Sequence, residues 1–407
     1  MAAPGSAERG LAELVAWLWR LGPVGEEPAA DAVAFGAADR AEELRALVRE
    51  RRLAGAVILG EGAREERVLS VPAAPWGDLA FVPVLTALAS FLPGVLGRPL
   101  VALPPVGCLR LDDAPGTAEL QLLDRAKPDA KERRRIDAMV RALDASKSVL
   151  VAAVAARAFD GRGEVVPIEQ VWPESFALIA DAVERGLMEP ACHGLLHLDP
   201  HEHAQGRVAP KEFLRLSREE AGARLDEALA WMRERLGPAR SFIAPAWGYS
   251  EGSLEAAAER DLATWTWPEP GPLLDGHLLR ETLLDGLPGL TGLDYAPLER
   301  MAVTGVPPTV VFHGRLLADR LPRLREARDV LSLARLVRRR DLERIAALRG
   351  VRWVGAQQLV ERLRAHEAIE VEGDRVDVPD GVEAVLIDAR PGPPRRAPAG
   401  AAPSARR

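Results

Sequence analysis

The sequence is poor in cysteine and has no excess of positive charge, and these two shortages exclude several classes of protein. Only Cys108 and Cys192 occur in 407 residues, which is too few for a disulfide scaffold. We interpret both as small buried residues, with modulation of a nearby metal as the alternative. The formal net charge of -7 argues against a protein that binds nucleic acid without sequence preference, because that role needs a basic surface.

Long hydrophobic runs are also missing. The best candidate, residues 79–96, is interrupted by Pro83 and Pro93, so no segment is predicted to span a bilayer. The apolar stretch near the amino terminus contains Glu8 and Glu13 and no small-residue cleavage site follows it. It is therefore predicted to form an amphipathic helix and not a signal peptide. We expect a cytoplasmic protein with no membrane partner.

From Cys108 onward, short apolar runs alternate with amphipathic segments. Repeated strand–helix units of this length are typical of parallel sheets, and their number predicts an α/β fold with a (β/α) barrel of seven or eight parallel strands. Strands are predicted at residues 108–111, 148–154, 186–192, 240–244, 262–266, 309–312 and 351–354. Helices are predicted at residues 130–145, 173–185, 217–236, 250–260, 327–348 and 356–366.

The regions on either side of the barrel have different patterns. Residues 1–100 contain helical periodicity and the buried run AGAVILG at 54–60, which predict a small N-terminal α/β segment. The barrel is predicted over residues 101–366. Residues 367–390 alternate apolar and charged residues between turn signals, which predicts a short C-terminal β appendage. Residues 391–407 are rich in Pro, Ala and Arg and are predicted to be a disordered tail.

Two acidic residues and two histidines form the main candidate site. Asp112 and Asp113 follow an apolar run, as at the end of a buried strand. His193 and His197 are four residues apart, which predicts that both imidazoles lie on one face of a helical turn. Two histidines and a carboxylate are ligands that zinc and similar ions take in catalytic sites. Position 194 is Gly where an HExxH site has its Glu, so one Asp is predicted to bind the metal and its neighbour to take a proton.

The candidate residues resemble the polysaccharide deacetylase (NodB-homology) superfamily of metal-dependent amide hydrolases, and in particular its divergent deacetylase-like branches. Its motifs occur here in the family's order, as LDD at 111–113, HGLLH at 193–197, FIAPAWGY at 242–249 and VVFHG at 310–314. The resemblance covers roughly residues 105–365 and implies a deformed barrel of the NodB type. One departure is Ala244 before Pro245, where the carbohydrate enzymes of the family carry an Arg.

The resemblance also implies a role for each candidate residue. By position in the motifs, Asp112 is the catalytic base and His313 is the catalytic acid. The ligands of one divalent metal ion are Asp113, His193 and His197. Zinc is the first choice for this ion, and cobalt, nickel or manganese are the alternatives.

The third motif supplies candidates for substrate binding, namely Pro245, Trp247 and Tyr249. Aromatic residues at the mouth of a barrel can stack on a flat substrate, although they also simply fill such mouths. In barrels of parallel strands the active site lies at the carboxyl ends of the strands. The motif residues are all predicted to lie at that edge, which supports the site independently of the resemblance.

These observations predict a metal-dependent hydrolase of carbon–nitrogen amide bonds. The simplest substrate is an N-acetylated sugar or a related amide, so the expected partner is a small molecule or a carbohydrate. One alternative is a hydrolase of a non-carbohydrate amide or cyclic imide. The other is a non-catalytic binding module on a deacetylase-like barrel.

Overall fold

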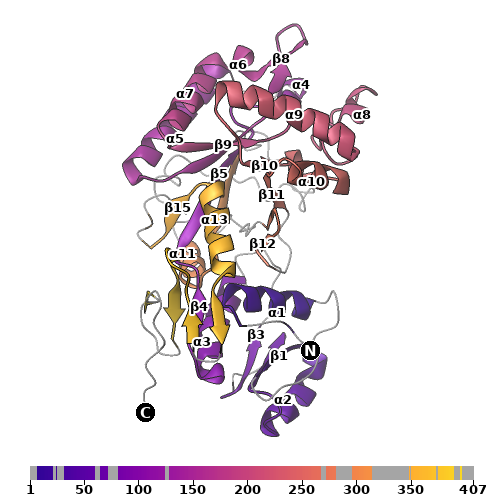
Figure 1. Cartoon of the computed structure of the whole chain (residues 1–407). Helices are drawn as coiled ribbons and strands as arrows, with labels where there is room; N and C mark the ends of the chain where they lie inside the picture. The colour runs from indigo at the N-terminus through magenta and orange to yellow at the C-terminus, as the bar shows by residue number, and fades with distance from the viewer. Residues whose placement is uncertain are drawn as a thin grey trace, which may run out of the picture.

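A largely parallel sheet lies at the centre of the molecule, shown in Figure 1 as a computed structural model. The structure describes residues 7–21, 24, 32–59, 65–71, 81–123, 128–266, 272–280, 296–313, 348, 350–372, 375–388 and 395–396. The strand order is β12-β13-β11-β10-β9-β6-β5-β14, and β15 also pairs with β5. The strands are β5 (Val106–Asp112), β6 (Leu150–Val154), β9 (Met188–Cys192), β10 (Ser241–Ile243), β11 (Ala263–Thr266), β12 (Leu274–Asp275), β13 (Leu278–Arg280), β14 (Thr309–His313) and β15 (Arg352–Val354).

Each of the seven strands predicted for the barrel is present, and the pairing between them is parallel. Every residue of β5 and β6 is buried, as in parallel sheets that are covered on both faces. Only β12 is antiparallel to its neighbour. In the described ranges the outer strands β12 and β14 do not pair with each other, so closure of the barrel stays a prediction.

Helices cover the sheet between successive strands (Figure 1). The main ones are α5 (Asp129–Ser146), α7 (Pro173–Glu184), α9 (Arg218–Arg235), α10 (Glu251–Ala258) and α13 (Ala356–Glu367). Ser217 and Glu220 form a capping box at the start of α9, which the S-x-x-E spacing indicates. The helix predicted at 327–348 falls almost wholly outside the described residues. No described helix is long and apolar enough to cross a bilayer.

Several short elements were not predicted. They include a β-hairpin formed by β7 and β8, and short helices that follow individual strands. Their bounds are α4 (Ala118–Leu122), β7 (Arg157–Phe159), β8 (Val165–Pro167), α6 (Ile168–Val171), α8 (Pro200–His203), η2 (Pro245–Trp247) and α11 (Ala296–Val303). Figure 1 shows α4, α6, α8 and β8 together at one end of the molecule.

The amino-terminal region has its own parallel sheet, in the order β1-β2-β3. Its elements are α1 (Ala7–Leu18), β1 (Val33–Ala37), η1 (Ala38–Arg40), α2 (Ala41–Arg49), β2 (Gly55–Leu59), β3 (Val68–Val71) and α3 (Phe81–Leu96). Strand β1 was not predicted. One face of the small sheet packs with α2 in a separate apolar cluster, whereas α1 and α3 join the main core. The boundary placed at residue 100 stays a prediction.

The carboxyl-terminal region contains antiparallel strands, as the alternating pattern indicates. Strand β16 (Glu370–Glu372) pairs with β17 (Arg375–Asp377). The next strand, β18 (Val385–Ile387), pairs with β4 (Leu100–Ala102) and with β19 (Arg395–Arg396). Apart from β19, the tail predicted to be disordered at 391–407 lies outside the described residues.

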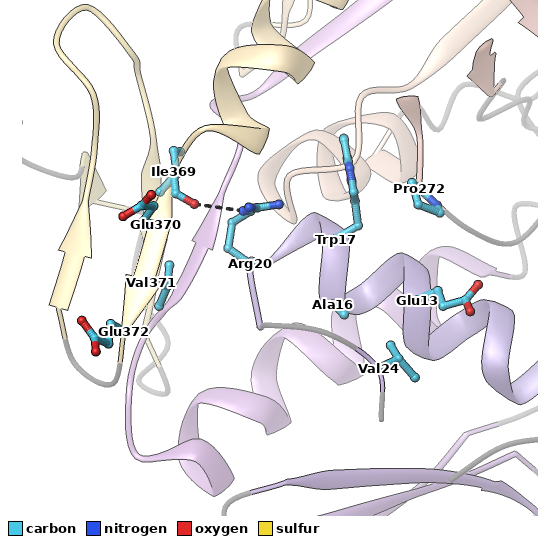
Figure 2. A pocket seen from close by; sticks show the side chains of 10 residues that line it. All are labelled: Glu13, Ala16, Trp17, Arg20, Val24, Pro272, Ile369, Glu370, Val371 and Glu372. Carbon is cyan, nitrogen blue, oxygen red and sulfur yellow. Dashed lines mark hydrogen bonds between the residues drawn. The ribbon is translucent and has the colours of Figure 1, made fainter. Parts of the chain in front are cut away.

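Helix α1 is fixed to the carboxyl-terminal elements by polar side chains (Figure 2). The guanidinium of Arg20 donates to the backbone carbonyls of Ile369, at 3.2 Å, and Glu367, at 2.8 Å. The indole N–H of Trp17 donates to the Glu367 carboxylate, and that of Trp19 donates to the carbonyl of Thr304. Thr304 precedes β14, so this junction lies near the amino ends of the strands. A cavity of about 680 Å³ lies beside it, lined in part by Trp17, Arg20 and Ile369 (Figure 2).

Candidate metal centre

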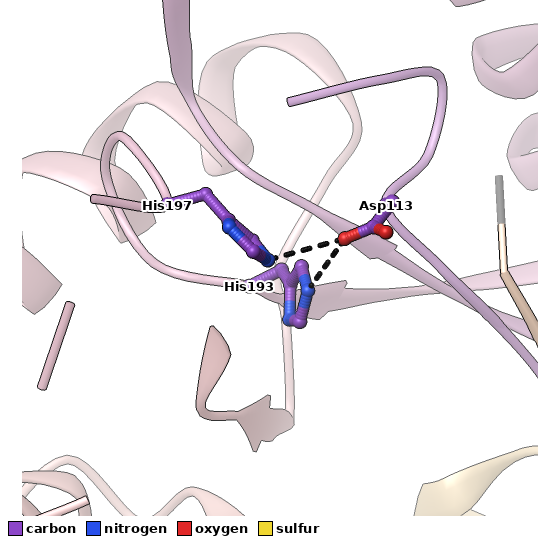
Figure 3. Close-up of side chains that lie close together, drawn as sticks. All are labelled: Asp113, His193 and His197. Carbon is purple, nitrogen blue, oxygen red and sulfur yellow. Dashed lines mark hydrogen bonds and ion pairs between the residues drawn. The ribbon is translucent and has the colours of Figure 1, made fainter. Parts of the chain in front are cut away.

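The structure brings Asp113, His193 and His197 together at the carboxyl edge of the sheet (Figure 3). Asp113 directly follows β5, and both histidines lie in the loop after β9. Oδ1 of Asp113 is 3.3 Å from Nε2 of His193 and 3.1 Å from Nε2 of His197. The two imidazoles are almost fully buried, whereas the Asp113 side chain is 15% exposed. The open side of the cluster therefore faces the edge where a ligand could enter.

The histidine pair does not lie on a helix, so that prediction was wrong. Residues 193–199 form an irregular loop, in which Gly194 has φ +84° and His197 has φ +58°. These left-handed conformations interrupt a helix at both ends of the motif. The loop folds back on itself, and this brings the imidazoles to a centroid separation of 4.9 Å. The two histidines, four residues apart, are therefore brought together by a loop and not by a helical turn.

A backbone hydrogen bond orients the ring of His193. Its Nδ1 lies 2.8 Å from the carbonyl oxygen of Ile243, the last residue of β10. Because a carbonyl can only accept, Nδ1 carries a proton, and Nε2 is the ring nitrogen that faces Asp113 and could bind a metal ion. Metal-binding histidines are commonly held in this way by a hydrogen bond from the other ring nitrogen.

Three ligand atoms of this set lie within 4.8 Å of one another. The set combines two imidazole nitrogens with one carboxylate oxygen, which suits zinc and other first-row divalent ions. With only three protein ligands, such a site leaves a coordination position open. The residues present therefore fit a catalytic metal ion. The geometry does not distinguish zinc from cobalt, nickel or manganese.

Asp112 is held by an arginine from its own strand. Nε of Arg110 donates to Oδ1 at 2.8 Å, and a terminal nitrogen donates to Oδ2 at 2.9 Å. Both side chains are buried, with exposures of 0% and 3%. The guanidinium also lies over the ring of Trp265, 5.2 Å from its centroid, and 5.9 Å from that of Trp247. A two-pronged bond of this kind fixes the plane of the carboxylate.

His313 is the last residue of β14, and its backbone is paired in register with Asp112. Adjacent parallel strands place these two positions at the same edge of the sheet. The side chain of His313 lies outside the described part of the chain. Its predicted role as an acid therefore stays a prediction.

The third motif forms a strained turn beside the site. Pro245 to Trp247 make a single 3-10 turn in which Ala246 and Trp247 both have φ of 50°. Pro245 is buried, while Trp247 and Tyr249 are partly exposed. Two successive left-handed residues other than Gly are costly, and such conformations cluster at binding and active sites. The turn brings Trp247 close to Arg110, and the predicted role of the motif in substrate binding is untested.

Sequence reasoning missed one residue of the site. The carboxylate of Glu212 is fully buried and accepts hydrogen bonds from three backbone amides of the histidine loop. It also pairs with Arg224 of α9. Glu212 lies in an irregular segment with no repeating pattern, so the sequence carries no signal for its burial or for its partners.

No protein-family model matches the chain, and no curated protein matches it either. Solved structures do.

The chain is similar to a protein from Mycobacterium smegmatis assigned as a polysaccharide deacetylase, with a TM-score of 0.41 and 16% identity, over 65% of this chain and 92% of that one. It is also similar to a family 4 carbohydrate esterase from Streptomyces lividans, with a TM-score of 0.33 and 12% identity, over 62% of this chain and 94% of that one. A third match is a pseudoenzyme of carbohydrate esterase family 4 from Bacillus anthracis, with a TM-score of 0.30 and 11% identity, over 52% of this chain and 55% of that one.

Proposed function

We propose that this chain is a metal-dependent hydrolase of carbon–nitrogen amide bonds, built on a NodB-like barrel. One observation carries the proposal. The ligand atoms of Asp113, His193 and His197 converge within 4.8 Å at the carboxyl edge of a parallel sheet, next to a buried carboxylate that is fixed by Arg110. A metal set beside a fixed base is the arrangement that hydrolysis by activated water requires.

Each residue has a distinct task in the proposed reaction. Asp113, His193 and His197 hold the ion, which when bound supplies Lewis-acid stabilisation of the charge that develops on the acyl oxygen. Asp112 removes a proton from the attacking water, and Arg110 fixes the orientation of its carboxylate. His313 protonates the leaving amine. The order of these steps is that of general base and then general acid catalysis.

We propose a small amide or an N-acetylated sugar as the substrate. Trp247 and Tyr249 offer partly exposed aromatic surface beside the site, which suits stacking on a sugar face or on another flat group. Ala244 stands where the carbohydrate enzymes of the superfamily carry an Arg. This difference and the proposed cytoplasmic location both favour a small soluble substrate over a polymer, and they keep the non-carbohydrate amide as the second candidate.

Metal content tests the centre directly. Elemental analysis of the purified chain should find about one divalent ion per molecule, and the His193→Ala, His197→Ala double variant should contain none while remaining folded. The matched control is His201→Ala, His203→Ala, because both of these histidines are exposed on neighbouring α8. The control should keep the ion. A parent chain that takes up neither zinc, cobalt, nickel nor manganese would exclude the proposed chemistry.

A substrate panel then tests the reaction. The metal-loaded protein is assayed for amine or acetate release from N-acetylhexosamines, from small N-acyl amides and from cyclic imides. Turnover of one class names the substrate. A protein that binds metal but hydrolyses none of these compounds would instead support the non-catalytic binding module.

A further inference from the structure

We propose that Glu212 is a positioning residue, which together with Arg224 holds the histidine loop in its metal-binding shape. The inference rests on the proposed function, because it concerns the loop that carries two of the metal ligands. It adds a residue with no direct contact to the ion.

The contacts of Glu212 are concentrated on one short stretch of backbone. Oε2 accepts hydrogen bonds from the amide N–H groups of Leu195 at 3.2 Å, Leu196 at 3.2 Å and His197 at 2.8 Å. Oε1 accepts from a guanidinium nitrogen of Arg224 at 2.6 Å. The Glu212 side chain is 0% exposed, and its bond with the amide of His197 is fully buried.

Three consecutive amides that point at one anion form a backbone nest. Without an acceptor, the buried amide of His197 would be unpaired, at a cost of roughly 1–3 kcal/mol. The carboxylate therefore stabilises this loop conformation over an opened one. His197 donates the shortest of the three bonds, and its left-handed φ of +58° is part of the conformation that the nest selects.

Gly194 shows that the loop is built around this carboxylate. A Cβ at position 194 would lie 2.4 Å from Oε2 of Glu212, and φ at this residue is +84°. Any larger residue would therefore displace the carboxylate and also strain the backbone. The absence of a Glu at position 194 thus has a structural reason, since a carboxylate from elsewhere in the chain occupies that space.

The segment around Glu212 also connects the loop to the rest of the site. Arg224, the partner of Glu212, lies on α9. The neighbouring residue, Phe213, packs edge-on against Phe242 of β10 at a centroid distance of 4.9 Å. Its backbone forms a bridge with Tyr249 of the third motif. Glu212 is thereby fixed from three sides, as a residue that positions others must be.

The test is cobalt binding to Glu212→Gln. The glutamine keeps the size of the side chain but loses the charge, and its NH₂ group cannot accept a hydrogen bond. Partners that orient metal ligands typically contribute 10–100-fold to metal affinity. We expect the cobalt dissociation constant to rise by at least about 10-fold. The visible absorption bands of the bound cobalt should change, since they report the ligand geometry.

The matched control is Glu189→Gln. Glu189 also accepts a backbone amide bond, from Gln357 at 3.1 Å, but it lies near the amino end of β9 and has no contact with the histidine loop. This variant should keep the parent's cobalt affinity and spectrum. Thermal unfolding of both metal-free proteins shows whether either change acts through global stability.

Gly194→Ala disturbs the contact between the histidine loop and Glu212 by a change in the loop itself. We expect it to weaken cobalt binding as well, and the double variant with Glu212→Gln should lose less than the product of the two single effects, because both changes disrupt one contact. Arg224→Gln, which leaves the three amide bonds in place, should have a smaller effect, and Arg224→Lys should restore part of it. These variants keep the inference testable if Glu212→Gln does not fold.

The outcomes separate the two proposals. If the parent binds neither cobalt nor zinc, nickel or manganese, the proposed function fails. If the parent binds cobalt and Glu212→Gln binds it with the same affinity and spectrum, the metal centre stands and the role of Glu212 is wrong.

Discussion

Left-handed backbone conformations occur in two settings in this protein. One is the carboxyl edge of the central sheet, and the other is the chain just after the end of a helix. Among the described residues, eight residues other than Gly have positive φ. Four of them, Arg20, Arg51, Lys147 and Asp261, follow the last residue of a helix within three positions, where this conformation ends helices routinely. The other four are Asp113, His197, Ala246 and Trp247. These four belong to three separate segments that meet at the candidate site.

The carboxyl edge also differs from the junction of α1 with α13 in the number of buried ion pairs. The carboxyl edge contains the pairs Arg110–Asp112 and Arg224–Glu212, whose carboxylates are almost fully buried. The junction of α1 with α13 relies instead on indole and guanidinium groups that donate to carboxylate and carbonyl oxygens of Glu367, and on the buried ring of His366. Strain and buried charge are both costly, so their occurrence together at the carboxyl edge supports the proposed site there.

The largest expected effect is a loss of turnover without a loss of metal at the carboxyl edge. Asp112→Asn keeps the size of the side chain but removes the base, so kcat should fall by about 10²–10⁴-fold. Metal content should stay at the parent value, because Asp112 is not one of the three ligands. Steady-state kinetics and elemental analysis on the same preparation measure both. A wild-type rate would show that Asp112 is not the base.

The next effect concerns the cost of buried charge. Arg110→Met leaves the Asp112 carboxylate buried without its two-pronged partner, and should lower the free energy of unfolding by about 3–5 kcal/mol. Denaturant unfolding of the metal-free protein measures this change. Arg133→Met is the control, since the Arg133–Glu174 pair is more than half exposed on both sides, and it should change stability little. If both substitutions lower the free energy of unfolding equally, burial of the Arg110–Asp112 pair does not make its loss more costly.

The stability of the opposite edge should depend on acid. Burial lowers the pKa of His366 from 6.5 to about 4, and the ring donates through Nε2 to the carbonyl of Leu18 at 2.9 Å. Below pH 6.5 the unfolded chain binds a proton that the folded chain excludes. Stability is therefore complete above pH 6.5 and decreases as the pH falls toward 4, by at most about 3 kcal/mol.

His366→Gln tests this dependence, because glutamine can donate to the Leu18 carbonyl but does not titrate. The difference in unfolding free energy between parent and variant should shrink as the pH falls from 7 to 4.5. His201→Gln, at an exposed position, should leave the pH dependence of the parent unchanged. A difference that stays constant over this range would mean that His366 titrates normally.

The smallest expected effect comes from relieving backbone strain, at a helix end and at the candidate site. Lys147→Gly at the end of α5 and Ala246→Gly in the third motif both place Gly at a positive φ. Each should stabilise the fold by about 0.5–1 kcal/mol. Only Ala246→Gly should also weaken catalysis, because it loosens the turn that carries Trp247. Chemical denaturation measures the stability of both variants, and kcat/KM measures their activity. If Lys147→Gly lowers activity as much as Ala246→Gly does, the turn at Ala246 has no special role in catalysis.

Local pattern was sufficient to predict the elements that carry the site. Long apolar runs located strands such as β5 and β6, and the order of the motifs indicated which side chains would meet at the carboxyl edge. The strand β1 was missed because its sequence VAFGA is short and contains Gly and Ala, which have no strand preference.

The conformation of the histidine loop could not be read from spacing. A pair of histidines four residues apart fits a helical turn, and only the anion held by its amides explains why the chain adopts a loop instead. Glu212 is 15 residues from His197, and no periodic pattern connects the two. Arg110 could be located on its strand, but its two-pronged contact with Asp112 depends on a rotamer that sequence does not specify.

The junction of α1 has a consequence for synthesis of the chain. Leu18 and the His366 that caps it are 348 residues apart. At about 5–20 residues per second, the ribosome needs roughly 20–70 s to make the second partner after the first. During that interval the carbonyl of Leu18 has no His366 ring from which to accept, so this hydrogen bond between α1 and α13 cannot form. The link between α1 and α13 therefore forms only after every described strand of the central sheet has been synthesised.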